Sequence, residues 1–100
     1  MISCSGGRCT LQGPVTIASV HSLLEEGGRR IAGVEVTVDL AGVTEVDSTA
    51  VSLLLEWRRQ AARANRTVRY VNLPANLRSL AELYGVTELL EEQRGERREE

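Results

Sequence analysis

The sequence predicts a small α/β sandwich, a mixed sheet of four to five strands with an N-terminal hairpin and three to four helices. Segments of strand character alternate with helical segments after an opening pair of strands. Helical crossovers favour parallel pairing of the later strands, whereas a tight turn makes the first pair antiparallel. A chain of 100 residues suffices for one core. We therefore expect a single domain over residues 1–92 and a flexible charged tail over residues 93–100.

The composition is that of an ordinary soluble globular domain, 42% hydrophobic and 26% charged. A net charge of −2 provides no basic field that would attract nucleic acid or an acidic membrane. No apolar run approaches the roughly 20 residues that span a bilayer. The first residues, MISCSGGR, lack the basic and then apolar profile of a signal peptide. These features lead us to expect a cytoplasmic protein.

Two cysteines, Cys4 and Cys9, flank a Gly6-Gly7 turn. This turn would place them opposite each other in a non-hydrogen-bonded pair, so a disulfide is geometrically possible. We nevertheless expect reduced thiols, because cytosolic cysteines normally remain reduced. With one histidine in the chain, no set of four metal ligands can be assembled, and we expect neither a metal nor a cofactor.

The first half of the chain contains the hairpin, a helix and the central strand. Strands are expected at Ile2–Cys4 and Cys9–Gln12, the second ended by Gly13-Pro14. A helix follows from about Thr16 to Gly27-Gly28 with an apolar stripe of Ile17, Val20 and Leu24. The segment from Val34 to Leu40 is β-branched and nearly continuously apolar, which is typical of a strand buried on both faces. We expect it to end at Ala41-Gly42.

The second half begins with a long helix that either Asp47 or Ser48 caps, and this helix runs to about Ala64. Residues 67–72 alternate like a strand. A further helix begins near Pro74, and Gly85 is placed as its C′ residue with Val86 as the hydrophobic contact after it. Its apolar stripe contains Leu77, Leu80, Ala81 and Tyr84. A short helical turn around residues 88–92 completes the domain.

The strongest candidates for functional residues lie in the corner at the start of the long helix, which is formed by Asp47, Ser48 and Thr49. Hydroxyls at the start of a helix lie beside backbone donors and the positive end of the macrodipole. The corner is either a plain N-cap or a regulatory hydroxyl that is phosphorylated or contacted by a partner, although the Asp47 carboxylate would oppose a phosphate. A serine nucleophile is excluded because His21 lies in the first helix and no Gly-x-Ser-x-Gly motif exists. We therefore expect no enzymatic activity.

The long helix has an apolar arc of roughly 200°, wider than a contact with one sheet requires. The surplus must be covered by the C-terminal helix or by another protein. Trp57 fits either a core position or an interface anchor. Four arginines form a basic patch that is either a solvated helix face or a contact with an acidic partner or lipid headgroups: Arg58, Arg59, Arg63 and Arg66.

Several motifs together resemble the STAS domain family. The strand ending in Asp39-Leu40, the Gly42-Val43 step, VDSTAV leading into LLLEW, and the later segment LPANLRSLAELYGV carry this resemblance. It extends from the opening hairpin to about Leu90 and is strongest from Val36 to Val86. Two groups of small single-domain members are relevant. One consists of anti-sigma factor antagonists phosphorylated at this loop, and the other of MlaB-like subunits of the Mla phospholipid transport system.

The run LLLEW and the Leu-Tyr pair near the end of the C-terminal helix are similar to MlaB-like sequences. Antagonists commonly carry D-S-[ST]-G-L, and here Ala50 replaces the glycine. The resemblance implies that Ser48 holds the family's phospho-acceptor position and that in the MlaB-like group this position faces the ATPase.

The resemblance therefore implies a non-catalytic subunit, peripheral to the inner membrane, that binds the cytoplasmic ATPase of an ABC-type phospholipid transporter involved in outer-membrane lipid asymmetry. The alternatives are an anti-sigma factor antagonist with a serine kinase partner, switched by phosphorylation at Ser48, and a small lipid-binding module. The residues expected at the partner surface are Asp47, Ser48, Thr49, Val51, Leu55, Trp57, Arg58, Leu77 and Tyr84.

Overall fold

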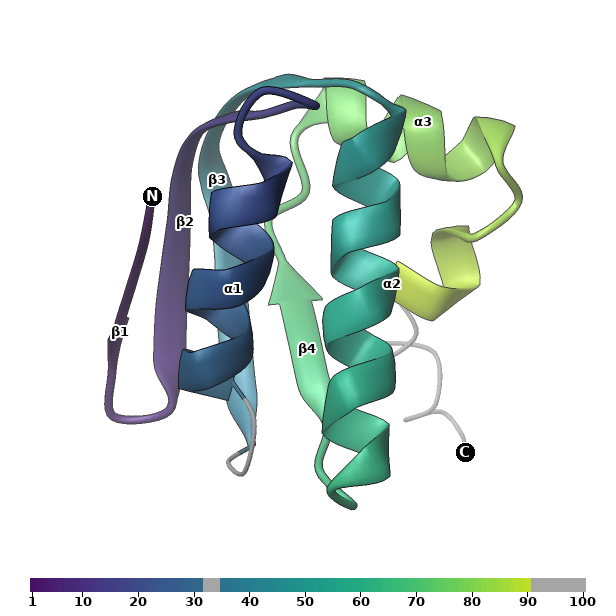
Figure 1. Cartoon of the computed structure of the whole chain (residues 1–100). Helices are drawn as coiled ribbons and strands as arrows, with labels where there is room; N and C mark the ends of the chain where they lie inside the picture. Colours follow the sequence, from purple (N-terminus) through teal and green to yellow (C-terminus); the bar gives the residue numbers. More distant parts are fainter. Residues whose placement is uncertain (32–34, 91–100) are drawn as a thin grey trace.

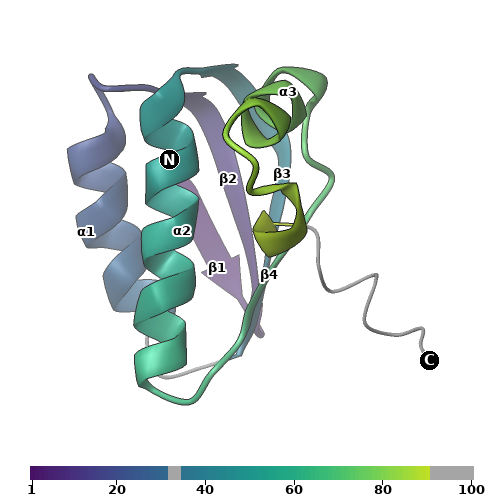
Figure 2. The ribbon, with the colours of Figure 1, turned by 90° about the vertical axis from the view of Figure 1, so that its right-hand side faces the viewer.

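The computed structural model describes residues 1–31 and 35–90. They form a four-stranded sheet in the order β1-β2-β3-β4, with β1 antiparallel to β2 and the remaining pairs parallel, as predicted. The first two helices lie side by side on one face of the sheet, and α3 lies on the β4 side of the molecule (Figures 1 and 2). The elements in chain order are β1 (Ile2–Ser5), β2 (Arg8–Val15), α1 (Val20–Ile31), β3 (Val36–Val46), α2 (Ser48–Arg63), β4 (Val68–Val71) and α3 (Ala75–Leu83).

A further helical turn covers residues 87–90. The start of the predicted central strand at Val34, the end of the closing turn at residues 91 and 92, and the predicted tail at 93–100 lie outside the described residues.

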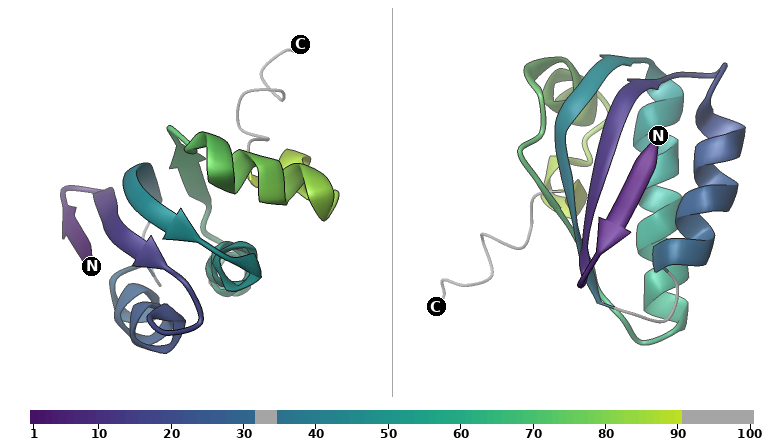
Figure 3. Two further views of the ribbon diagram at one scale, coloured as in Figure 1. Left: turned by 90° about the horizontal axis from the view of Figure 1, so that it is seen from above. Right: turned by 90° about the vertical axis from the view of Figure 1, so that its left-hand side faces the viewer.

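The central strand β3 is buried on one face, not on both. Val36, Val38 and Leu40 have at most 4% of their surface exposed, whereas Thr37 and Asp39 between them are half-buried. This alternation arises because α1 and α2 cover the same side of the sheet, which is seen edge-on in Figure 3. The opposite side is polar, and the prediction of a strand with two buried faces is wrong.

A polar cluster crosses the open side of the sheet at Asp39. Its carboxylate accepts hydrogen bonds from Arg8 Nη2 at 2.9 Å, from Asn72 Nδ2 at 3.2 Å and from the Ala41 N–H at 2.9 Å. The Ala41 N–H, then Asn72 and Arg8, lower the pKa of Asp39 because each bond favours the charged carboxylate. The cluster thus joins β2, β3 and the residue that follows β4.

Two strands continue through glycines that were expected to end them. β3 runs past Gly42 because a Cβ there would lie 2.9 Å from Gln12 Cγ and 3.3 Å from the Leu11 carbonyl oxygen, so glycine allows β2 to approach closely. β2 itself runs past Gly13-Pro14 to Val15. Pro14 is tolerated because the N-terminal residues pair with β2 no further than Gln12, so the end of β2 has no partner strand on that side within the described residues.

Helix α1 differs from its prediction at both ends. It begins at Val20 after a turn in which the Thr16 N–H donates to Ser19 Oγ at 3.1 Å. Ile17 consequently lies outside the helix and is 72% exposed. The helix also continues through Gly27, which packs beneath the indole ring of Trp57.

Trp57 is a core residue with 0% exposure, and the surplus apolar arc of α2 is covered from both sides. α1 contacts one flank of the helix and α3 the other. The C-terminal helix, one of the two alternatives left open by the sequence, therefore covers part of the arc, and α1, which was not considered, covers another part. The buried residues of α2 are Ala50, Val51, Leu53, Leu54, Trp57 and Ala61.

Helix α3 ends as predicted, with Gly85 at φ +71°. The Gly85 N–H donates to the Glu82 carbonyl at 3.1 Å and the Val86 N–H to the Ala81 carbonyl at 2.9 Å. These two bonds form a Schellman motif, in which a residue with positive φ allows the last carbonyls of a helix to be satisfied.

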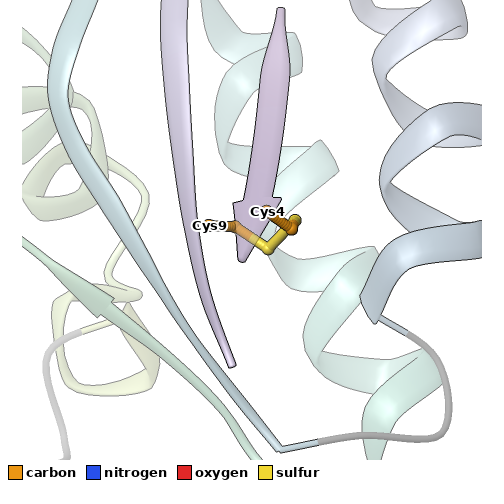
Figure 4. Close-up of a disulfide and its surroundings, with 2 residues drawn as sticks. All are labelled: Cys4 and Cys9. Carbon is orange, nitrogen blue, oxygen red and sulfur yellow. A yellow bond between two sulfur atoms is a disulfide. The ribbon is translucent and has the colours of Figure 1, made fainter. Parts of the chain in front are cut away.

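The N-terminal hairpin contradicts the prediction of reduced thiols. Cys4 pairs with Cys9 across the strands, their Cα atoms lie 4.0 Å apart, and the two residues form a disulfide (Figure 4). The turn at Gly6-Gly7 fixes this register, because both residues have positive φ, as a two-residue hairpin loop of type I′ requires.

Candidate functional site

The start of α2 is held in place by Asp47, which is the N-cap residue. Its Oδ1 accepts hydrogen bonds from the Thr49 N–H at 2.9 Å and from the Thr49 hydroxyl. Its Oδ2 accepts a bond from the Ile17 N–H at 2.9 Å. One carboxylate therefore caps the helix and ties it to the segment between β2 and α1, which resolves the choice between Asp47 and Ser48 as the cap.

The same bonds determine the charge at this corner. The Thr49 hydroxyl and then the Ile17 N–H lower the pKa of Asp47, because both donate to the ionised carboxylate. Asp47 thus places a fixed negative charge at the helix N-terminus and occupies the Thr49 N–H donor. A phosphate on the neighbouring Ser48 would experience repulsion from this carboxylate.

The two hydroxyls at the corner have different environments. Thr49 is half-buried and bonded to Asp47, whereas Ser48 is exposed. Ser48 borders a groove of about 330 Å³ between α2 and the end of α3. The groove is lined by Ser48, Val51, Ser52, Leu55, Tyr84 and Val86. Its walls are mainly apolar, and Tyr84 is 52% exposed.

A second groove of about 390 Å³ lies on the other side of α2, towards α1. Ser52 and Leu55 line both grooves, so this part of α2 forms a ridge between two depressions. The remaining lining residues of the second groove are Val20, Leu24, Leu53, Glu56 and Arg59. We call Ser48, Ser52, Leu55 and Tyr84 the ridge surface.

The structure gathers some of the predicted partner residues and separates others. Ser48, Val51, Leu55 and Tyr84 line one groove, and Asp47 and Thr49 support it from the helix end. Trp57 and Leu77 are buried, with 0% and 1% exposure, so the expectation that they contact a partner is corrected. Leu77 packs in the core, because the apolar stripe of α3 faces β3 and α2.

The basic patch is partly neutralised within α2. Glu56 bonds to Arg59 and, at 3.4 Å, to Arg63. Arg58 is half-buried one turn beyond Leu55. A solvated helix face with internal ion pairs accounts for much of this patch.

Sequence reasoning missed Ser52, Val86 and the second groove. Ser52 follows Ser48 by four residues and therefore lies on the same helix face, a spacing that could have been used. Val86 was expected only as the hydrophobic contact after Gly85, because its position beside α2 depends on how α3 packs against that helix. The residues that the structure describes contain no cluster of histidine, cysteine or carboxylate side chains able to hold a metal.

A narrow space lies between α2 and the sheet. Its lining includes Leu11, Leu40 and Leu54, and it is too narrow to admit a water molecule. No helix within residues 1–31 and 35–90 is long and apolar enough to cross a membrane.

Comparisons with known proteins identify the family. A family model described as "Mlab, STAS domain" matches residues 4–91. The chain belongs to the STAS domain family. This match confirms the resemblance recognised in the sequence motifs and covers nearly all of the described structure. A comparison with curated proteins gave no match.

Solved structures confirm the STAS fold. The anti-sigma factor antagonist SpoIIAA in its unphosphorylated form is similar with a TM-score of 0.69 and 17% identity, over 97% of this chain and 93% of SpoIIAA. A structure described as Mglu is similar with a TM-score of 0.59 and 21% identity, over 77% of this chain but 20% of the other protein. At these identities, both likenesses concern the fold alone.

Proposed function

We propose that this STAS domain is a non-catalytic regulatory or assembly subunit that binds the cytoplasmic ATPase of an ABC-type phospholipid transporter of the Mla kind. Such a transporter contributes to outer-membrane lipid asymmetry, and the domain would lie at the inner membrane through its complex. The family description supports the choice of partner. The observation that carries the proposal is the ridge surface, in which an exposed hydroxyl lies beside accessible apolar side chains.

The ridge surface suits a protein partner for physical reasons. Leu83 and Tyr84 at the end of α3 are 74% and 52% exposed, which adds large apolar side chains beside the groove. Grooves on both sides of Leu55 would accept side chains projecting from a partner. Asp47 holds the helix start rigid, so little conformational entropy is lost on docking.

The alternative is an anti-sigma factor antagonist whose partner is a serine kinase. The likeness to SpoIIAA favours this function at the level of the fold. One local feature disfavours it: Ala50 occupies the place of the glycine in the antagonist motif D-S-[ST]-G-L. The second alternative, a lipid-binding module, has less support because the space described between α2 and the sheet is too narrow to admit even a water molecule.

The test is a pull-down of the tagged chain from native lysate, with mass spectrometry of the captured proteins and of the peptide 46–57. Recovery of an ABC-type ATPase with unmodified Ser48 would support the proposal. Recovery of a small serine kinase with phosphate on Ser48 would establish the antagonist function instead.

A matched pair of variants then locates the contact. Ser48→Arg should reduce binding of the recovered ATPase at least tenfold, because a long charged side chain would occupy the groove. Ser3→Arg places the same side chain at an exposed position of β1 and should bind like the wild type. Both variants should keep the wild-type circular dichroism spectrum. Equal binding by Ser48→Arg and the wild type, or unfolding of Ser48→Arg, would remove the support for docking at this corner.

A further inference from the structure

We propose that Cys4 and Cys9 form a reversible redox-modification site, which exchanges with small-molecule thiols and disulfides while the domain stays folded. The pair lies near the start of β2, where Cys9 is in register with Val38 of the parallel strand β3. Ser48 follows the other end of β3, so the two sites lie at opposite ends of the sheet. The proposal therefore does not depend on the function assigned to the ridge surface.

The hairpin is positioned by bonds other than the disulfide. At its open end, Met1 and Gln12 exchange two backbone hydrogen bonds, each of 2.9 Å. At the turn, the Gly7 carbonyl accepts a bond of 3.0 Å from the Thr37 N–H of β3. Breaking the sulfur–sulfur bond leaves these contacts in place. The two thiols would therefore remain opposite each other, at a high effective concentration for closing the bond again.

The two sulfurs differ in access. Cys9 is completely buried in the apolar face of the sheet, whereas Cys4 is half-buried on the edge strand β1. Figure 4 shows the bridge between β1 and β2, with Cys4 on the outer of the two strands. Because Cys4 is the more exposed residue of the pair, we expect an attacking small-molecule thiolate to reach its sulfur first. This asymmetry gives the pair an accessible residue and a protected, resolving residue.

The exchange balances with two equivalents of a small thiol such as glutathione. A thiolate bonds to the Cys4 sulfur, the Cys4–Cys9 bond breaks, and its electron pair leaves on the Cys9 sulfur, which takes up a proton. A second thiolate attacks the glutathione sulfur of the mixed disulfide and releases Cys4 as a thiolate, which is protonated. The products are the protein dithiol and one molecule of oxidised glutathione. In the reverse direction, the two protein thiols are oxidised and the small-molecule disulfide is reduced.

The experiment incubates the native protein in a series of buffers with different ratios of reduced to oxidised glutathione, followed by alkylation and mass spectrometry. We expect complete interconversion in both directions without denaturant. Cooperative melting should be seen at both ends of the series, with the Tm of the oxidised form about 10 °C higher, because the bridge closes a short loop in the unfolded chain. Thiols released only in denaturant would show a structural bridge and overturn the proposal. Failure to oxidise in excess oxidised glutathione would overturn it as well.

Single and double variants test the roles of the two sulfurs. Treated with oxidised glutathione, the Cys9→Ser variant should gain one glutathione on the accessible Cys4, and the Cys4→Ser variant should gain none on the buried Cys9. The double variant Cys4→Ser, Cys9→Ser should melt cooperatively near the Tm of the reduced wild type. Equal modification of both single variants would refute the difference in access. A double variant that does not fold would show that the bridge is needed for folding and would also overturn the proposal.

Discussion

Gly27 offers a quantitative test of how α1 packs on α2. A Cβ at this position would overlap the six-membered ring of Trp57 and lie 2.8 Å from its Nε1. Trp57 is completely buried, and its Nε1 has no hydrogen-bond partner within the part of the chain that the structure describes. The indole is held by packing alone and has little room to move aside. Replacing Gly27 with alanine should therefore force the two helices apart.

The expected magnitude follows from two opposing effects. Alanine is favoured over glycine within a helix by about 0.5–1 kcal/mol. Overpacking a core costs about 1–3 kcal/mol, and a rigid buried ring places Gly27→Ala well inside this range. The net effect should be a loss of about 1–2 kcal/mol in the free energy of unfolding. For a domain of this size, the Tm should fall by about 5–10 °C.

Gly28→Ala is the matched control on the same helix. A Cβ there meets only the Oε1 of Gln60 at 3.2 Å, and this is the mobile end of a flexible side chain. Gly28→Ala should therefore be neutral or stabilising by up to about 1 kcal/mol. Urea unfolding followed by far-UV circular dichroism gives the free energies. Trp57, the single tryptophan in the chain, reports on its own burial by fluorescence.

Two results would refute this reasoning. A Gly27→Ala variant as stable as Gly28→Ala would show that α1 and α2 are not in close contact at this point. Placing Gly27→Ala in a Trp57→Phe background should reduce its cost, because the smaller ring leaves space for the methyl group. An unchanged cost in that background would assign the effect to something other than the indole.

Two further predictions concern hydrogen bonds. Asp39 and Asp47 have lowered pKa values in the folded state, so the stability they provide is present above about pH 4, the pKa of an unfolded aspartate, and is lost as the pH falls towards their folded values. The Tm difference between the wild type and Asp47→Asn should narrow below pH 4, and a constant difference would contradict the prediction. Tyr70→Phe removes a buried hydroxyl that donates to the Leu54 carbonyl at 2.7 Å and should cost about 0.5–1.5 kcal/mol in urea unfolding. Tyr84 is exposed, so Tyr84→Phe should change the free energy of unfolding by less than about 0.5 kcal/mol. Equal effects of the two variants would show that the hydrogen bond of the Tyr70 hydroxyl does not stabilise the fold.

The helix termini of the second half were predictable because their signals are local. Asp47 reaches the N–H of Thr49 two residues later, and Gly85 takes the positive φ that a Schellman turn requires. The antiparallel hairpin follows from its glycine turn in the same way. Each feature depends on bonds between neighbours in sequence, so the residue types are sufficient to predict it.

The candidate site was predictable only in part. The spacing along α2 brings Ser48, Val51 and Leu55 to one side of the helix, and the structure confirms that they share a groove. Trp57 and Leu77 have equally apolar surroundings in sequence, yet both lie in the core. Periodicity identifies the apolar side of a helix but does not show how far its neighbours cover that side.

The sequence by itself determined the order of elements, the glycine turn of the hairpin, the C-terminal turn of α3 and the family motifs, because these depend on residue type and short spacing. Only the tertiary structure showed what role Gly27 and Gly42 have in packing and that the two cysteines are bonded to each other. Gly27 and Gly42 were expected to end a helix and a strand, but both lie inside these elements, where a neighbouring ring or strand needs the space of a missing side chain. A glycine that interrupts the chain and a glycine that admits a neighbour are identical in sequence. They differ in what packs against them, which is a property of residues distant along the chain.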